Sequence, residues 1–243
     1  MLWDGRSQSG LHATWVRGQS TTKMACVIED LIDLVDWRRR VGDLYRIGGP
    51  DAITEFRRRR DELFKSHPQS PIEPDERSTF TGLRYFDPDP RYRVMARLED
   101  GPGDEMVIET GGADGAIHYR RAGRLVFDLL GQQCSLTVLS LHQYAGGLFV
   151  PFKDATSGHE TYGGGRYLFD TAKNTDGLVL EVDAGTLDVT VDFNYAYNPS
   201  CVYSPRWACP LAPPENTLKV AVRAGERMYE HPASPDQASG GPV

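Results

Sequence analysis

The spacing of hydrophobic residues changes once along the chain, near Pro71. Before that point apolar residues recur every three or four positions, which is the period of an amphipathic helix. From Val27 this period predicts a first helix, which ends at Gly48 and Gly49. Its predicted apolar face begins with Ile28, Leu31, Ile32 and Val35 and is extended by Leu34, Trp37, Val41 and Leu44. A second helix is expected from near Pro50 to the segment "SHPQSP", because a residue that precedes proline avoids helical geometry.

After Pro71 the period shortens to two, which is typical of β-strands. Ten short segments rich in β-branched and aromatic residues are bounded by Gly, Asp or Asn. They are "YRVMARLED", "EMVIET", "AIHYRRA", "RLVFDLLG", "CSLTVLSLHQY", "GLFVPFKD", "GRYLFD", "GLVLEVD", "LDVTVDFNYAY" and "LKVAVRAG". The fold class expected from this series is mainly β, a single antiparallel β-barrel or barrel-like sandwich preceded by an N-terminal helical arm.

The two periods divide the chain into a helical arm at 24–66 and a barrel or sandwich domain at 67–230. Residues 1–23 and 231–243 are rich in small and polar residues without a period, and we expect them to be disordered tails.

Composition narrows the class of protein. With 40% hydrophobic and 25% charged residues the chain is typical of a globular protein, and no apolar run approaches the ~20 residues of a membrane span. The N-terminus lacks the apolar core of a signal peptide, so we expect a cytoplasmic protein without a membrane partner. The net charge of −7 argues against nucleic acid as a partner. We interpret the basic run Arg57–Arg60 as a solvated helix face balanced by Asp61 and Glu62.

The cysteines give no metal or redox motif. Cys26, Cys134, Cys201 and Cys209 show no CxxC spacing, and the histidines form no recognisable cluster, so neither a metal nor another cofactor is predicted. In "NPSCVYSPRWACPLAPPEN" we expect a rigid proline-rich loop with Cys201, Cys209 and Asn216 in structural roles. A disulfide, a metal clip and a nucleophilic Cys201 are the alternatives. We predict that neither zinc nor a disulfide holds this loop.

The segment "TYGGGRYLFD" offers a candidate anchor for an anion. Its three glycines lack the GxxxxGK[ST] spacing and the following helix of a phosphate-binding loop, so a turn or bulge entering a strand is favoured. Arg166 follows them, and a guanidinium binds a carboxylate or phosphate through two parallel hydrogen bonds. The alternative is a structural ion pair of Arg166 with Asp154, Asp170 or Asp192.

Two long segments carry a resemblance. "PFKDATSGHETYGGGRYLFD", followed by "DFNYAYNPSCVYSPRWACPLAPPENTLKVAVRAGE", resembles the bacterial and archaeal family known as domain of unknown function 1684. The resemblance extends over roughly Asp51 to Glu226 and implies where a site lies. It implies no activity, because none is established for the family.

Two functions fit these residues. In the first, the protein binds a small polar or anionic molecule in a pocket at one end of the barrel. The expected ligand-binding residues are Arg166, Asp154, Asp192, Asn194, Tyr197 and Asn198. Arg166, Asp192 and Asn194 are expected to meet at one hollow. Two carboxylates in unlike environments would also permit acid and base chemistry, so an enzyme stays open.

In the second, the protein is a non-catalytic interaction module. The motif then only fixes the proline-rich loop, and the N-terminal helices dock on a partner or form a homodimer.

Overall fold

The computed structural model describes residues 21–112, 115–142, 146–182 and 185–231. The two predicted tails lie largely outside these residues. Residues 21–23 and His231 are described. The former are already helical, so the helical arm begins earlier than the predicted residue 24, and His231 bonds the carbonyl oxygen of Val202.

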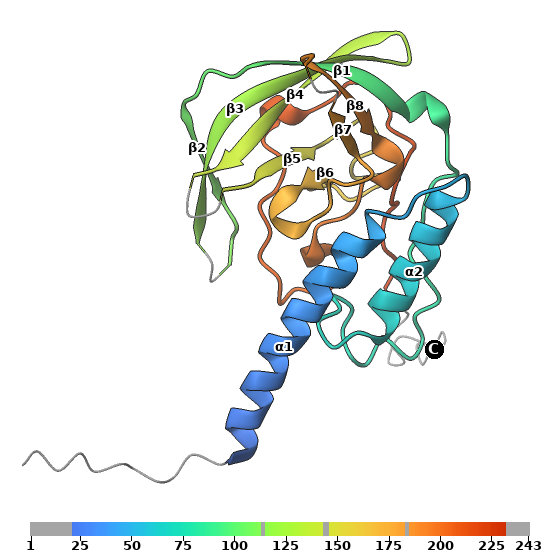
Figure 1. Ribbon diagram of the computed structural model, residues 1–243, viewed down its shortest axis with the longest axis vertical. Coiled ribbons are helices and arrows are strands. Elements are labelled where there is room, and N and C mark those ends of the chain that lie inside the picture. Colours follow the sequence, from blue (N-terminus) through green and yellow to red (C-terminus); the bar gives the residue numbers. More distant parts are fainter. Residues whose placement is uncertain (1–20, 113–114, 143–145, 183–184, 232–243) are drawn as a thin grey trace, which may run out of the picture.

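Two helices form the N-terminal arm: α1 (Thr21–Leu44) and α2 (Ala52–Ser66). The C-terminal part of α1 packs beside α2, and its N-terminal part projects away from the body of the protein (Figure 1). The arm agrees with the helical period of the sequence.

The apolar residues of α1 form two faces rather than the single face predicted. Val41 and Leu44 are buried, and Trp37 packs against the core. Ile28, nine residues before Trp37, lies half a helical turn away at 100° per residue. The outer face is exposed: the exposed fraction is 54% for Ile28, 60% for Leu31, 62% for Ile32 and 49% for Val35.

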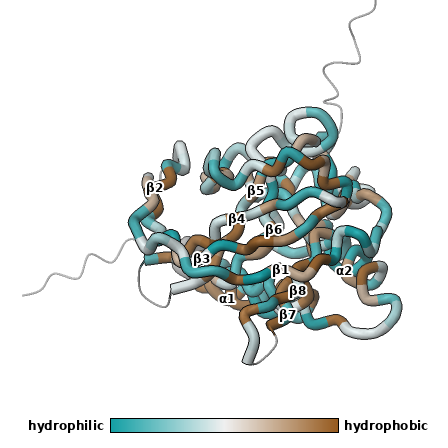
Figure 2. Tube along the Cα trace, turned by 90° about the horizontal axis from the view of Figure 1, so that it is seen from above, coloured by the Kyte–Doolittle hydropathy of each residue, from teal (hydrophilic) through white to brown (hydrophobic). Residues whose placement is uncertain are grey.

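The strands form one antiparallel sheet that curls into a half-barrel (Figure 1). They are β1 (Arg93–Asp100), β2 (Glu105–Glu109), β3 (Ala116–Leu129), β4 (Gln132–Leu141), β5 (Leu148–Phe152), β6 (Arg166–Asp170), β7 (Leu180–Val182) and β8 (Asp188–Asp192). Their order in the sheet is β6-β5-β4-β3-β1-β8-β7, and β2 pairs with β3. The mainly β fold class is therefore confirmed. Buried and more exposed residues alternate along much of β3, which carries both hydrophobic and hydrophilic residues (Figure 2), whereas every residue of β6 is buried.

A bridge between Tyr167 and Tyr197 brings the sheet round toward closure. Tyr167 lies in β6, at one end of the sheet, and Tyr197 lies on the chain that leaves β8. Their backbones exchange two hydrogen bonds, of 2.8 and 3.0 Å. The segment "DFNYAYNP" therefore lies where the two ends of the curled sheet meet.

Three of the ten predicted strand segments differ in the structure. "AIHYRRA" and "RLVFDLLG" are one strand, β3, with a register shift between Arg121 and Gly123. The predicted strand "LKVAVRAG" is not a strand, although Leu218, Val220, Val222 and Ala224 are buried. Its alternation is real because every second side chain enters the core. The backbone, however, bonds to the 153–155 segment and to buried side chains, as described below, rather than to a neighbouring strand.

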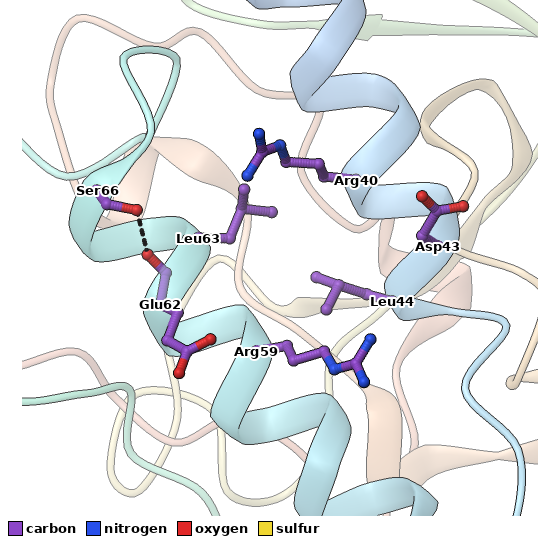
Figure 3. A pocket seen from close by; sticks show the side chains of 7 residues that line it. All are labelled: Arg40, Asp43, Leu44, Arg59, Glu62, Leu63 and Ser66. Carbon is purple, nitrogen blue, oxygen red and sulfur yellow. Dashed lines mark hydrogen bonds between the residues drawn. The ribbon is translucent and has the colours of Figure 1, made fainter.

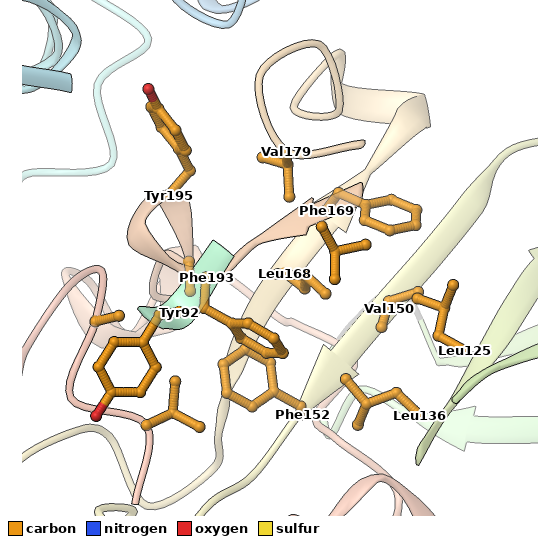
Figure 4. Packing of buried hydrophobic residues seen from close by; sticks show 14 of the residues in the cluster. Tyr92, Leu125, Leu136, Val150, Phe152, Leu168, Phe169, Val179, Phe193 and Tyr195 are labelled. Carbon is orange, nitrogen blue, oxygen red and sulfur yellow. The ribbon is translucent and has the colours of Figure 1, made fainter. Parts of the chain in front are cut away.

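The core fills the concave side of the sheet (Figure 4). Phe152 of β5 meets Phe193 edge to face, with ring centroids 5.3 Å apart. Both rings are fully buried, and each contributes about 1.5–3 kcal/mol through removal of apolar surface from water.

Candidate functional site

Arg166, the predicted anchor for an anion, has both terminal nitrogens of its guanidinium bonded within the protein, whereas its buried Nε has no partner among the described residues. Its side chain is buried, and its guanidinium donates to Asp154 Oδ2 at 2.9 Å. It also donates to the carbonyl oxygens of Val222 at 2.7 Å, Ala224 at 2.5 Å and Glu226 at 3.0 Å. Burial lowers the pKa of Arg166, against the opposing effect of Asp154. The structural ion pair left open by the sequence is thus present, and Arg166 fastens the 222–226 segment beneath the sheet.

Asp154 completes this structural centre. Its Oδ1 accepts hydrogen bonds from Thr156 N at 2.8 Å, Thr156 Oγ1 at 2.6 Å and Val222 N at 3.1 Å. Gly165, before Arg166, has a φ of +94°, and a Cβ there would lie 2.5 Å from the carbonyl oxygen of Phe152. The triple glycine therefore serves close backbone approach at a turn, as expected, rather than a phosphate loop.

Asp192 and Asn194 form a separate group with Asp89. The Asp192 Oδ1 atom accepts from Asn194 N at 2.9 Å and from Asn194 Nδ2 at 2.8 Å. The Asn194 amide also bonds the backbone of Asp89 in both directions, each at 2.9 Å. Burial raises the pKa of Asp192, and the bonds from Asn194 oppose that rise.

The predicted geometry of the site therefore needs correction. We expected Arg166, Asp192 and Asn194 to meet at one hollow. Arg166 instead bonds Asp154 and the 222–226 backbone, whereas Asp192 and Asn194 bond each other and Asp89. Buried polar groups require partners, and a folded backbone supplies them as readily as a ligand does. Neither Asp154 nor Asp192 lines the cavity described next.

Tyr197 and Asn198, the remaining predicted ligand-binding residues, line a cavity of about 200 Å³ between the helical arm and the proline-rich loop. We call it the helix–loop cavity. The residues that line it are Leu34, Trp37, Arg38, Val41, Arg60, Phe64, Gln69, Pro71, Lys173, Thr175, Tyr197, Asn198, Ser200, Tyr203, Trp207, Ala208 and Cys209. It joins elements from both predicted parts of the chain.

A buried ion pair supports one wall of the helix–loop cavity. Arg60 Nε donates to Glu226 Oε1 at 2.8 Å, and both side chains are almost fully buried. Burial opposes the charge of Arg60, but Glu226 raises its pKa well above the usual value. The other oxygen of Glu226 accepts from Asn198 N at 2.9 Å and from the Tyr203 hydroxyl at 2.5 Å. The interpretation of Arg57–Arg60 as a solvated face is therefore wrong at Arg60.

The charged residues that line the helix–loop cavity are all basic. They are Arg38, Arg60 and Lys173, and the lining includes no Asp or Glu. Arg38 donates to the carbonyl oxygen of Ala172 at 2.6 Å, and Lys173 Nζ lies 3.2 Å from Asp170 Oδ2. Glu226 and Asp170, the acidic partners of Arg60 and Lys173, do not themselves line the cavity.

The proline-rich loop is held by its predicted structural residues. The Asn216 side chain is fully buried and bonds Thr137 N at 2.7 Å, Thr137 O at 3.0 Å and Pro151 O at 2.8 Å. Cys201 N donates to Cys209 Sγ at 3.4 Å, and both cysteines are free thiols. Within the described residues no group of three or more His, Cys, Asp or Glu side chains is placed to hold a metal ion.

A second groove lies between α1 and α2 (Figure 3). It is lined by Arg40, Asp43, Leu44, Arg59, Glu62, Leu63 and Ser66. Charges of both signs line it, and Arg40 and Arg59 already pair with Asp36 at 2.6 Å and Glu55 at 2.5 Å. This groove therefore shows no preference for a ligand of one charge.

Comparison with known proteins places the chain in a family. Residues 78–227 match the family described as protein of unknown function DUF1684. The chain belongs to this family. Among solved structures it is similar to an uncharacterised protein of Haloarcula marismortui, determined by solution NMR, with 40% identity and a TM-score of 0.53. That similarity covers 72% of this chain and 91% of the archaeal one. No curated protein matches this chain.

Only some of the residues that line the helix–loop cavity lie inside the DUF1684 match. Tyr197, Asn198 and the proline-rich loop lie inside the matched residues, whereas α1 and α2 lie before them. The match begins at residue 78, later than the Asp51 suggested by the resemblance. Helix α2, which supplies Arg60, is therefore outside the part of this chain that defines the family.

Sequence reasoning missed three basic residues of the cavity: Arg38, Arg60 and Lys173. A signal existed for Arg60, because it falls four residues after Phe56 and three before Leu63, on the apolar stripe of α2. Arg38 and Lys173 carried no comparable signal. Their proximity arises from tertiary packing, in which Arg38 bonds residue 172 across 134 residues of chain.

No helix among the described residues is both long enough and apolar enough to cross a membrane.

Proposed function

We propose that this DUF1684 protein binds a small anionic molecule in the helix–loop cavity. The observation that carries the proposal is the charge of the lining: Arg38, Arg60 and Lys173 with no carboxylate, in a chain whose net charge is −7. A concentration of positive charge in a recess of an acidic protein attracts anions and excludes cations.

The three cations contribute differently. Arg60 is fixed and largely neutralised by Glu226, so it positions the wall. Arg38 and Lys173 lie nearer the solvent, and the Lys173 side chain is 39% exposed. Arg38 supplies the planar donor pair that matches a carboxylate or phosphate group.

Size and lining restrict the ligand further. The cavity volume of about 200 Å³ is below the ~300 Å³ at which pockets for drug-sized ligands begin. Trp37, Tyr203 and Trp207 provide apolar walls. A small carboxylic acid or phosphate ester with a short apolar body fits this combination.

Asn198 favours a ligand with a donor beside its anionic group. Its Nδ2 donates to Arg227 O at 2.8 Å, whereas its buried Oδ1 has no partner among the described residues. An unsatisfied buried acceptor costs about 1–3 kcal/mol. A hydroxyl or N–H of the ligand would relieve that cost. The proposal places this function in the cytoplasm, where the free thiols of Cys201 and Cys209 would remain reduced.

A thermal-shift screen tests the proposal. The full-length protein is heated with small mono- and dicarboxylates, phosphate esters and their neutral amide or alcohol analogues. We expect stabilisation by one class of anion and none by its neutral analogue, because a ligand that binds only the native state raises the melting temperature. The Lys173→Gln variant should lose this shift and Arg39→Gln, on α1 outside the cavity, should keep it. No anion-specific shift across the panel would contradict the proposal.

The outer face of α1 favours a second function, as an interaction module that pairs with a second copy of this chain. The exposed fractions of Ile28, Leu31, Ile32 and Val35 lie between 49% and 62%, on a helix that projects from the body (Figure 1). Between residues 29 and 40 the acidic Glu29 and Asp33 come before the basic Arg39 and Arg40. Antiparallel pairing of two copies would place the acidic part of each α1 beside the basic part of the other.

Sedimentation equilibrium tests this pairing. We expect a dimer for the wild type and a monomer for Ile32→Glu. Leu187→Glu is the matched control. Leu187 lies outside α1, and its exposed fraction of 61% is close to the 62% of Ile32. A monomeric wild type would contradict the pairing. If that monomer co-sedimented with lipid vesicles through the same stripe, the occupant of the stripe would be a membrane surface instead.

A further inference from the structure

Two thiols of the proline-rich loop lie side by side at the edge of the helix–loop cavity. Cys201 is in a short 3-10 helix (Ser200–Val202), and its backbone N–H points at the Cys209 sulfur, 3.4 Å away. The two side chains also hydrogen-bond each other. The Cys209 sulfur therefore lies against the residue whose thiol it would have to bond.

The surroundings make the two thiols unequal. The hydrogen bond from Cys201 lowers the pKa of Cys209 to about 6, against the opposing effect of burial and with help from Lys173. The same hydrogen bond raises the pKa of Cys201. Near neutral pH, Cys209 is then the thiolate and Cys201 the thiol, which is the division between an attacking and a resolving cysteine.

Access is also unequal. Cys209 lines the helix–loop cavity, together with Lys173 and Trp207. Cys201 is partly exposed and contacts Tyr162 through a side-chain hydrogen bond. A third described cysteine, Cys134, is buried in β4 away from both. A small reactant in the cavity would therefore meet Cys209 first.

We propose that Cys209 and Cys201 form a redox-active dithiol that undergoes exchange with low-molecular-weight disulfides. The Cys209 thiolate attacks one sulfur of the disulfide R–S–S–R, so that a Cys209–S–R bond forms and RS⁻ leaves. Cys201 then gives its proton to solvent and attacks Cys209 Sγ, which forms the Cys201–Cys209 disulfide and releases a second RS⁻. The dithiol loses two electrons, and R–S–S–R is reduced to two thiols. The reduced loop seen here is the starting state, and the exchange does not depend on anion binding in the cavity.

Bis(2-hydroxyethyl) disulfide is a suitable probe, because it is small enough for a cavity of about 200 Å³. The folded full-length protein is incubated with it near neutral pH, quenched with acid, alkylated, digested with trypsin and analysed by mass spectrometry. Arg206 lies between the two cysteines, so trypsin places them in different peptides and a disulfide appears as a cross-link. We expect this cross-link in the wild type and in the control Cys134→Ser.

The two single variants distinguish the roles. Cys201→Ser should accumulate one half of the probe on Cys209 as a mixed disulfide, because no resolving thiol remains. Cys209→Ser should give no cross-link. In this variant the probe should modify Cys201 at least roughly tenfold more slowly than it modifies Cys209 in Cys201→Ser. Circular dichroism confirms that each variant is folded. The absence of a cross-link in the folded wild type would overturn the proposal, as would equal modification rates of Cys209 in Cys201→Ser and of Cys201 in Cys209→Ser.

Discussion

Arg60 of α2 and Glu226, near the end of the described chain, form a buried ion pair 2.8 Å long across 166 residues of sequence. The pair connects the helical arm to the segment that Arg166 fastens beneath the sheet, because the Glu226 carbonyl oxygen accepts from Arg166. The Glu226 carboxylate also bonds Asn198 and Tyr203, which line the helix–loop cavity. The arm, the sheet and the loop are thus joined at one residue, Glu226, through its carboxylate and its backbone carbonyl group.

We expect Arg60→Met to destabilise the fold by about 3 kcal/mol or more, because it leaves the Glu226 carboxylate buried without its cation. Urea unfolding followed by circular dichroism measures the loss. Arg58→Met is the matched control, since Arg58 belongs to the same basic run but has an exposed side chain. Equal destabilisation by the two substitutions would show that the buried pair has no special role.

Replacement of Arg166 should release the segment that it holds. Arg166→Met removes the donors to Val222, Ala224 and Glu226, whose carbonyl groups then lose their partners. We expect faster hydrogen exchange at residues 218–226 and faster tryptic cleavage after Lys219. Arg223→Met is the control, because Arg223 is exposed and pairs only with Glu160 near the surface. Unchanged exchange in a folded Arg166→Met protein would refute the fastening role.

Asp61 should make stability depend on acid pH. Its Oδ1 accepts from Leu83 N at 3.0 Å, and burial raises its pKa from 3.8 to about 6. Between these values the native state binds more protons than the unfolded state, so this residue's contribution to stability falls as the pH rises through the window. Asp61→Asn retains an acceptor for Leu83 without the charge.

We therefore expect Asp61→Asn to be more stable than the wild type at pH 7 and to lose that advantage near pH 4. Urea unfolding at pH 4, 5, 6 and 7 gives the difference between the two proteins. Asp51→Asn, on the exposed first turn before α2, provides the reference. A difference that does not change with pH would mean that Asp61 is ionised alike in both states.

The sequence predicted the helices and strands better than it predicted what each of them packs against or bonds to. The periods of 3.6 and two located both helices and most strands, because they record which side chains leave water. They did not separate the two apolar faces of α1, since a stripe on a helix is hydrophobic whether a core or a second molecule covers it. They also mistook the 218–225 segment for a strand, because alternate burial does not require a neighbouring strand.

The site was predicted only in part for a related reason. Two of the predicted ligand-binding residues, Tyr197 and Asn198, line the helix–loop cavity, but Arg166 and Asp192 bind different partners within the protein. A sequence shows that polar residues need partners and does not show whether a ligand or a backbone provides them. The basic lining depends on Arg38 and Lys173 being brought together by packing between α1 and the segment after β6.

The most direct test of the anion-binding account is isothermal titration of the best anion from the screen into the wild type, Arg38→Gln, Lys173→Gln and Arg39→Gln. We expect the first two substitutions to weaken binding roughly tenfold or more, because each removes a charge-assisted contact worth about 1.5–3 kcal/mol. Arg39→Gln should bind as the wild type does, since Arg39 does not line the cavity. Equal affinities in all four proteins would contradict the account.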